Sequence, residues 1–222
     1  MLNMHRFIVV ILRFAVRWSI PAELKNLKNS TADEVARALA VRYQFGSAFE
    51  SLLSRTLTLD LPPGLRETFQ ANLEEEQGLS QSYPGAKHSI GRLRLLNALG
   101  IDSEVWQSEI HPAMVKVIQV FDGLIALVNP LFVAAGLAAF ESLVAPQYTC
   151  LLEALMRTHP YLTDADTEHL RDHIHHDVFH GNDALAALAA AITTPYDLIV
   201  ALVAITEAKR TWTRFWQEVV RT

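Results

Sequence analysis

The residues best suited to chemistry lie in one segment, EHLRDHIHHDVFHGND, at positions 168–183. Asp177 stands there among five of the nine histidines of the chain, which are His169, His173, His175, His176 and His180. On a helix each residue advances by about 100°, so Asp177 and His180 fall within about 40° of His173. His169 shares this face, His176 lies at its edge, and His175 points away. Imidazoles and a carboxylate on one face suit iron, manganese or zinc. A solvated histidine-rich surface is the simpler alternative.

A metal site in a helical protein also needs ligands from other helices, and Glu141 is a candidate. It lies in AGLAAFESLVAP, where no other charged residue stands. Burying a lone carboxylate costs several kcal/mol unless a cation compensates. That cation is either a structural ion-pair partner or a metal.

A second source of carboxylates is the run Glu74, Glu75 and Glu76 in NLEEEQG. Three consecutive glutamates are typical of a solvated face. However, Phe69 and Leu73 place part of the same segment inward, so we expect one of the three side chains to face the core.

The elements that position these residues are predicted to be helices, because apolar residues recur with a period near 3.6 and strand signals are scarce. We expect about seven helices in one all-α domain over residues 1–222, in which residues 1–20 form an amphipathic helix packed on the body. The expected helices cover residues 5–18, 30–57, 62–78, 87–98, 117–156 with a break near 129–130, 163–192 and 195–219, with a short one near 103–110.

Bulk properties exclude several classes of protein. The formal charge of −5 and the pI near 6.0 leave no basic footprint for nucleic acid. A single cysteine, Cys150, cannot form an intramolecular disulfide and fits the cytoplasm. Arg13 and Arg17 interrupt the apolar run 5–18, and Asp122 and Glu141 interrupt the run 117–146, so we expect no membrane span.

Three motifs occur in an order that resembles the haem-oxygenase-like diiron oxidases and oxygenases. They are NLEEEQG followed by His88, then AFESLVAPQY, then His-x3-Asp-x2-His, and together they cover about residues 70–182. Each motif is weak alone, and the six ligands in order make a fairly specific match. The resemblance implies an all-α, seven-helix haem-oxygenase-like up-and-down bundle of the TenA and PqqC type, with two iron ions as cofactor and O2 as co-substrate.

Carried over residue by residue, the resemblance implies a set of six metal ligands: Glu75, His88, Glu141, His173, Asp177 and His180. Glu74 and Glu76 remain alternatives to Glu75, and Glu50 is a candidate extra ligand. One departure is that His88 follows Glu75 by thirteen residues, a wider gap than family members usually show. Either the intervening loop is longer here or His88 is not a ligand.

The activity implied by the resemblance is that of a non-haem diiron oxygenase or oxidase in natural-product biosynthesis. The substrate would be a small metabolite, most simply an amino acid or amine, and the outcome N-oxygenation, desaturation, carbon–carbon cleavage or cyclisation. We expect a homodimer. The substrate pocket is expected among aromatic residues, which are Tyr43, Phe45, Phe49, Phe140, Tyr148 and Phe179. Lys87, Arg92 and Lys209 are candidates to bind a carboxylate, and surface positions are the simpler interpretation for all three.

Other classes stay open. A cofactor-independent thiaminase-like or pyrroloquinoline-quinone-synthase-like enzyme of the same fold would not need six ligands, and the thiaminase-like branch would need a pocket cysteine such as Cys150. A zinc-binding regulatory protein would use four histidines, namely His169, His173, His176 and His180. A ferritin-like protein is disfavoured because the chain has no Glu-x-x-His pair. Haem oxygenase itself would need an N-terminal proximal histidine, for which His5 is a poor candidate.

Overall fold

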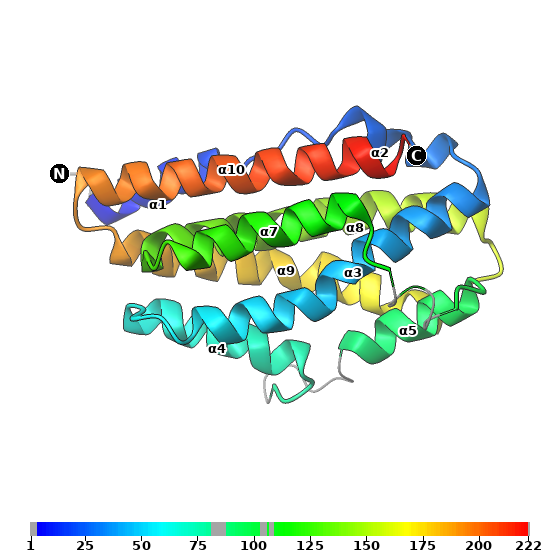
Figure 1. Cartoon of the computed structure of the whole chain (residues 1–222), viewed down its shortest axis with the longest axis horizontal. Coiled ribbons are helices and arrows are strands. Elements are labelled where there is room, and N and C mark those ends of the chain that lie inside the picture. The colour runs from blue at the N-terminus through cyan, green and yellow to red at the C-terminus, as the bar shows by residue number, and fades with distance from the viewer. Residues whose placement is uncertain (1–3, 81–87, 103–105, 107–108, 222) are drawn as a thin grey trace.

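The structure is a computed structural model that describes residues 4–80, 88–102, 106 and 109–221. Within those ranges every regular element is a helix, and the long helices run roughly along one axis (Figure 1). The elements are α1 Met4–Ala15, α2 Ala22–Asn26, the 3-10 helix η1 Leu27–Asn29, α3 Ala32–Thr56, α4 Pro63–Glu76, α5 His88–Ala98, α7 Pro112–Ala126, α8 Pro130–Thr158, α9 Asp164–Ala191 and α10 Pro195–Val219. The expected break at 80–86 and most of the expected short helix at 103–110 lie outside the described residues.

Helix starts follow directly from the sequence. The side chains of Thr31, Thr163 and Thr194 each accept a hydrogen bond from the backbone N–H three residues on, and the carboxylate of the acidic residue at that position accepts one from the backbone N–H of the threonine. These capping boxes satisfy backbone groups that the first turn leaves unpaired. α3, α9 and α10 therefore begin within two residues of the predicted positions.

The predicted break near residues 129–130 is confirmed. α7 ends at Ala126, Val128 takes a φ of 52°, and α8 begins at Pro130. The Asn129 side chain accepts from the backbone N–H of Phe132 at 3.1 Å and so caps α8.

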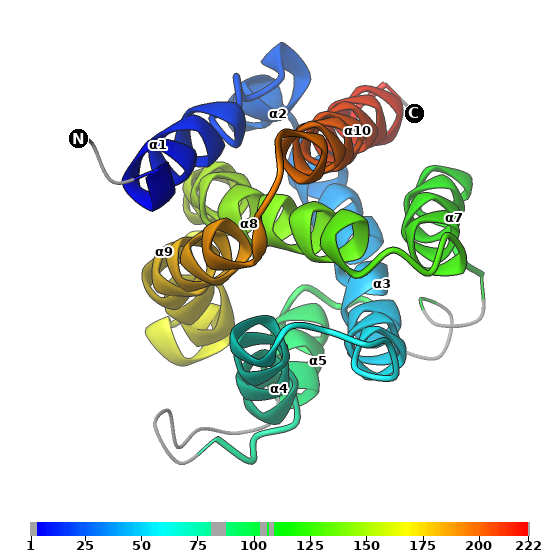
Figure 2. The ribbon, with the colours of Figure 1, turned by 90° about the vertical axis from the view of Figure 1, so that its left-hand side faces the viewer.

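α8 is the central helix of the bundle, with α3, α7, α9 and α10 around it (Figure 2). It is long and apolar enough to cross a membrane, yet 78% of its most apolar 18-residue window is buried inside the protein. A helix that is apolar on all sides is expected at the centre of a bundle. α8 is therefore a core helix, and it carries Glu141 into the interior.

The N-terminal helix α1 lies against α9 and α10. Ile8 and Leu12 are its buried residues. At the last residue of α1, Lys209 of α10 donates to the carbonyl of Ala15 at 2.6 Å, and beyond the helix Trp18 donates to Thr213 at 3.0 Å. Lys209 therefore joins α10 to the end of α1.

The site depends on how closely α9 approaches its neighbours. A Cβ added to Gly181 of α9 would lie 2.9 Å from Oγ of Ser142 on α8. A Cβ added to Gly91 of α5 would lie 2.8 Å from Cβ of His169 on α9. Glycine at both positions lets α8 and α5 pack against the histidine-bearing helix at short range.

Candidate metal centre

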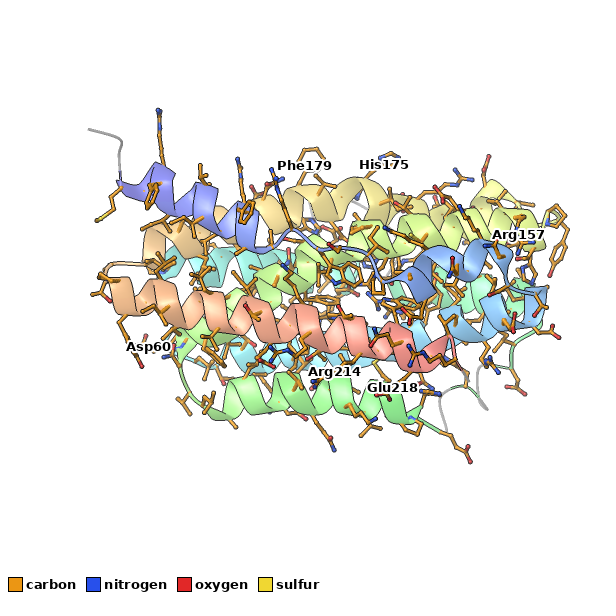
Figure 3. All side chains as sticks on the ribbon, turned by 90° about the horizontal axis from the view of Figure 1, so that it is seen from above. Asp60, Arg157, His175, Phe179, Arg214 and Glu218 are labelled. Carbon is orange, nitrogen blue, oxygen red and sulfur yellow. The ribbon has the colours of Figure 1, made fainter. Side chains whose placement is uncertain are left out.

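One face of α9 turns its polar side chains into the protein. His169, His173 and Asp177 are buried, and His180 is nearly so. His175 is exposed and points outward in Figure 3. This agrees with the angular spacing expected for a helix.

The placement of Phe179 in a substrate pocket is wrong. Its side chain is 59% exposed on the outer side of α9 (Figure 3). Phe179 follows His173 by six residues, which rotates it by about 120° from the buried face. Phe179 directly precedes His180 in the sequence, but neighbouring residues of a helix point about 100° apart. The side chain of Phe179 therefore faces away from the buried face that carries His180.

A first group of donor atoms comes from α8 and α9. Atoms of Glu141, Asp177 and His180 all lie within 4.8 Å of one another. Asp177 Oδ2 is 2.9 Å from Nδ1 of His173, and its Oδ1 is 3.5 Å from Nδ1 of His180. Asn72 on α4 donates to Glu141 at 3.4 Å. The two carboxylates are thus oriented by neighbours on two helices, α4 and α9.

A second group joins α5 to α9. Nitrogen atoms of His88, His169 and His173 lie within 4.8 Å of one another. The rings meet edge to face, with centroids 4.5 Å apart for His88 and His173. Nε2 of His169 is buried without a hydrogen-bond partner. A neutral imidazole nitrogen is a common metal ligand, and a buried one without a protein partner is available for that role.

The C-terminal end of α4 adds two carboxylates. Glu75 Oε2 lies 3.0 Å from Nε2 of His180, and its Oε1 lies 4.0 Å from Nε2 of His88. Glu76 Oε1 lies 3.1 Å from Nδ1 of His88, and its Oε2 accepts from Arg92 at 3.3 Å. Glu74 is partly exposed and accepts from Gln70 at 2.9 Å. Two of the three glutamates therefore face inward, where the sequence predicted one.

These residues enclose one small cavity. Its lining consists of Phe49, Asn72, Glu75, Glu76, His88, Glu141, His173, Asp177 and His180. Four buried carboxylates in one cavity are unstable unless cations balance them. Mixed imidazole and carboxylate donors are the set that iron, manganese and zinc prefer. The residues present therefore fit a metal centre.

Comparison with known proteins now places the chain. The sequence profile of a family of iron-containing redox enzymes matches residues 36–208. The chain belongs to this family of iron-containing redox enzymes. The match spans the helices that carry the cavity, from α3 to α10, and no curated protein matches the chain.

Solved structures share the fold of this iron-containing redox enzyme. A CADD-like protein of unknown function from Nostoc punctiforme superposes with a TM-score of 0.81 at 16% identity, covering 98% of this chain and 97% of that one. A domain of unknown function with a haem-oxygenase-like fold from Shewanella denitrificans gives 0.71 at 17%, covering 96% and 89%. A TenA homologue from Pseudomonas syringae pv. tomato gives 0.77 at 11%, covering 98% and 92%. The predicted all-α haem-oxygenase-like fold is confirmed.

When no metal ion is bound, protons on neighbouring groups reduce the repulsion among the buried carboxylates. Burial lowers the pKa of His180, but hydrogen bonds to Asp177 and Glu75 outweigh burial and raise it to about 11. Burial, together with the charge of Asp177, raises the pKa of Glu141 well above its usual range. Divalent cations would take the place of such protons.

The remaining carboxylates keep low pKa values for different reasons. Burial opposes ionisation of Glu76, but the charges of His88 and Arg92 hold its pKa well below its usual range. Burial likewise opposes ionisation of Asp177, and His173 lowers its pKa by charge and hydrogen bond. These two groups stay anionic in the metal-free enzyme.

The other expected site residues have mixed outcomes. Phe49 lines the cavity, whereas Tyr43 is buried behind it with its ring 5.5 Å from that of His169. Glu50 Oε1 lies 3.7 Å from Nη2 of Arg92, and Glu50 is absent from the lining. Phe45, Phe140 and Tyr148 line an adjoining cavity. Lys87 lies outside the described residues.

Sequence reasoning left Asn72 out of the site and did not place His169 in the diiron ligand set. Both had a signal in the sequence. Asn72 precedes Glu75 and Glu76 by three and four residues, so the three share a helix face. His169 precedes His173 by four and lies on the same face of α9.

Proposed function

We propose that the chain is a non-haem diiron oxygenase or oxidase that uses O2 to oxidise a small metabolite. The observation that carries the proposal is the presence of two donor groups whose residues, all but His169, line one cavity. His88, His169 and His173 form one group, and Glu141, Asp177 and His180 form the other. Glu75 contacts His88 and His180 and so links the groups.

Each donor group would hold one iron ion, with Glu75 or Glu76 as further ligands. Two bound ferrous ions would supply electrons for the reduction of O2, which is chemistry that amino acid side chains cannot supply alone. Membership of an iron-containing redox family supports iron over the other metals that suit these donors.

The chain's own residues would orient the donors and exclude water. Asp177 hydrogen-bonds His173, so these two ligands orient each other, and Asn72 hydrogen-bonds Glu141 from outside the ligand set. Phe49 and Phe140 close the apolar side of the site, with ring centroids 4.8 Å apart. An enclosed apolar wall protects reactive species from side reactions with water.

The substrate class we propose is an amino acid or amine, oxidised in natural-product biosynthesis by a cytoplasmic homodimer. The haem-oxygenase-like sequence motifs support that class. The single cysteine supports the cytoplasm.

Two features argue against the alternatives. Cys150 is partly buried on α8 and lines neither cavity, which disfavours a thiaminase-like nucleophile. His176, one of the four histidines of a zinc-binding regulator, keeps its side chain 34% exposed at the edge of the site. A regulator would also have no use for four buried carboxylates.

Oxygen consumption tests the proposal. Protein loaded anaerobically with ferrous iron should consume O2 with a transient change in visible absorption, and candidate amino acids should accelerate the reaction. Glu141→Gln should abolish the transient, because it removes a charged ligand, while Glu74→Gln on the exposed side of α4 should not. Failure to take up iron, or equal O2 consumption by Glu141→Gln and the wild type, would contradict the proposal.

A further inference from the structure

A second cavity adjoins the metal cavity and contains two buried arginines. The cavities share Phe49, Glu76, Glu141, His173 and Asp177. The rest of the second lining is Arg42, Phe45, Gly46, Arg92, Phe140, Val144 and Tyr148. The second cavity therefore places the arginines and several candidate metal ligands around one space.

Arg42 on α3 is a buried cation that makes its hydrogen bond and its ring contacts with neutral groups. Its side chain is 2% exposed, and its Nε donates to Gln147 at 3.2 Å. Its Cζ lies 4.8 Å from the ring centroid of Trp212 and 4.9 Å from that of Tyr148. In the described part of the chain no carboxylate forms an ion pair with it. A buried charge without a counter-ion is costly, so the site favours an anion here.

Arg92 on α5 also keeps a donor unused. Nη1 contacts Glu76 at 3.3 Å, but Nη2 is buried without a hydrogen-bond partner, 3.7 Å from Glu50. A Cβ on Gly46 would overlap the Arg92 guanidinium. Glycine at this position of α3 therefore makes room for the Arg92 guanidinium in the lining that also contains Arg42.

We propose that Arg42 and Arg92 bind the carboxylate of the substrate in this second cavity. The planar guanidinium fork matches a carboxylate. The aromatic rings of Phe45, Phe140 and Tyr148 would hold an apolar remainder against the metal ligands. Nearby Glu76 and Asp177 repel a dianion, which favours a carboxylate over a phosphate.

The charge balance expected with two metal ions bound also favours a carboxylate ligand. The four carboxylates of the metal cavity would balance two divalent ions. That leaves two guanidiniums against the single carboxylate of Glu50. A singly charged anion completes the balance. The inference rests on the proposed function for its chemistry, and it narrows the substrate from amines in general to molecules that carry a carboxylate.

Calorimetric binding measurements test this without turnover. Three matched probes are 3-phenylpropanoate, L-phenylalanine and phenethylamine, with inorganic phosphate as a fourth, each applied to iron-free and zinc-loaded protein. We expect the two carboxylates to bind to at least one form and to compete with each other, and phenethylamine to bind at least tenfold more weakly. Binding of neither carboxylate to either form, equal binding of phenethylamine, or binding of phosphate alone would overturn the inference.

Variants assign the binding to the arginines. Arg42→Gln and Arg92→Gln should each weaken carboxylate binding at least tenfold, and Arg42→Lys should restore part of it. Arg94→Gln, on the same helix as Arg92 but paired with Glu168 at the surface, should bind like the wild type. If Arg42→Gln does not fold, Gly46→Ala provides a second test, because it displaces the Arg92 guanidinium without removing a charge. Unchanged binding in the folded arginine variants would contradict the inference.

Iron titration on the same samples separates the two proposals. Iron uptake without carboxylate binding would refute the anion site alone. Carboxylate binding without iron uptake would refute the diiron function alone.

Discussion

Nε2 of His180 on α9 lies 3.0 Å from Oε2 of Glu75 on α4, so an imidazole and a carboxylate join these helices inside the cavity. Glu75 also lies 4.0 Å from His88 on α5. One carboxylate thus contacts a histidine from each donor group. This position makes Glu75 the residue whose charge should matter most to both of the proposed metal ions.

Glu75→Gln should weaken ferrous iron binding at least about tenfold, because even outer contacts of a metal site change affinity by about 10–100-fold. Anaerobic calorimetric titration measures the change. Glu74→Gln is the matched control, since Glu74 bonds Gln70 away from the cavity. Equal affinity of Glu75→Gln and Glu74→Gln would show that Glu75 is not a ligand.

His169→Ala should lower the iron content of purified, reconstituted protein, because His169 shares a donor group with His88 and His173. His175→Ala removes another histidine of α9, one whose side chain is exposed to solvent, and it should leave iron content unchanged. Metal analysis with circular dichroism as the folding control distinguishes the two. Full iron content in folded His169→Ala protein would remove His169 from the ligand set.

Iron binding at pH 7 should release at least about one proton per chain, because ligating imidazoles are neutral. His180 supplies it, since its pKa in the metal-free protein is about 11. Calorimetry in buffers of different ionisation enthalpy measures the release. A binding enthalpy that does not depend on the buffer would contradict this assignment.

The same proton makes metal-free stability depend on pH in a defined direction. A folded pKa raised above the ordinary value of 6.5 stabilises the fold fully below about pH 6.5, and this stabilisation is lost as pH rises toward 11. Iron affinity should rise over the same range as the imidazole loses its proton. Thermal unfolding measured across this pH range should show a smaller pH dependence of stability for His180→Gln than for the wild type.

Gly181→Ala should destabilise the protein by about 1–3 kcal/mol, because the added methyl group would meet Ser142 on α8. Gly123→Ala in α7 meets nothing within 4 Å and should stabilise the protein by up to about 1 kcal/mol through helix propensity. Urea unfolding measures both. If the two changes had the same sign, close packing of α9 on α8 would not explain the glycine.

Local sequence rules predicted α9 well. Threonine caps and a 3.6-residue period place His173, Asp177 and His180 on one buried face. The same arithmetic explains why Phe179 had to point outward, an error that came from treating sequence adjacency as spatial adjacency.

Contacts between segments that are distant along the chain could not be predicted from the sequence. Glu76 faces inward as well as Glu75 because the end of α4 meets α5 through His88 and Arg92 and meets α9 through His180. His88 reaches the cavity despite its unusual distance from Glu75 along the chain. Neither fact follows from helix periodicity, because each depends on how α5 docks against its neighbours.

The number of iron ions bound per chain tests the central claim most directly. Anaerobic titration with ferrous iron, followed by Mössbauer spectroscopy of the loaded protein, counts the ions and reports whether they occupy distinct sites. Convergence of two donor groups predicts two equivalents in two nitrogen- and oxygen-coordinated environments. Saturation at one equivalent would contradict the claim. So would iron binding that stays unchanged when Glu75 or His173 is substituted.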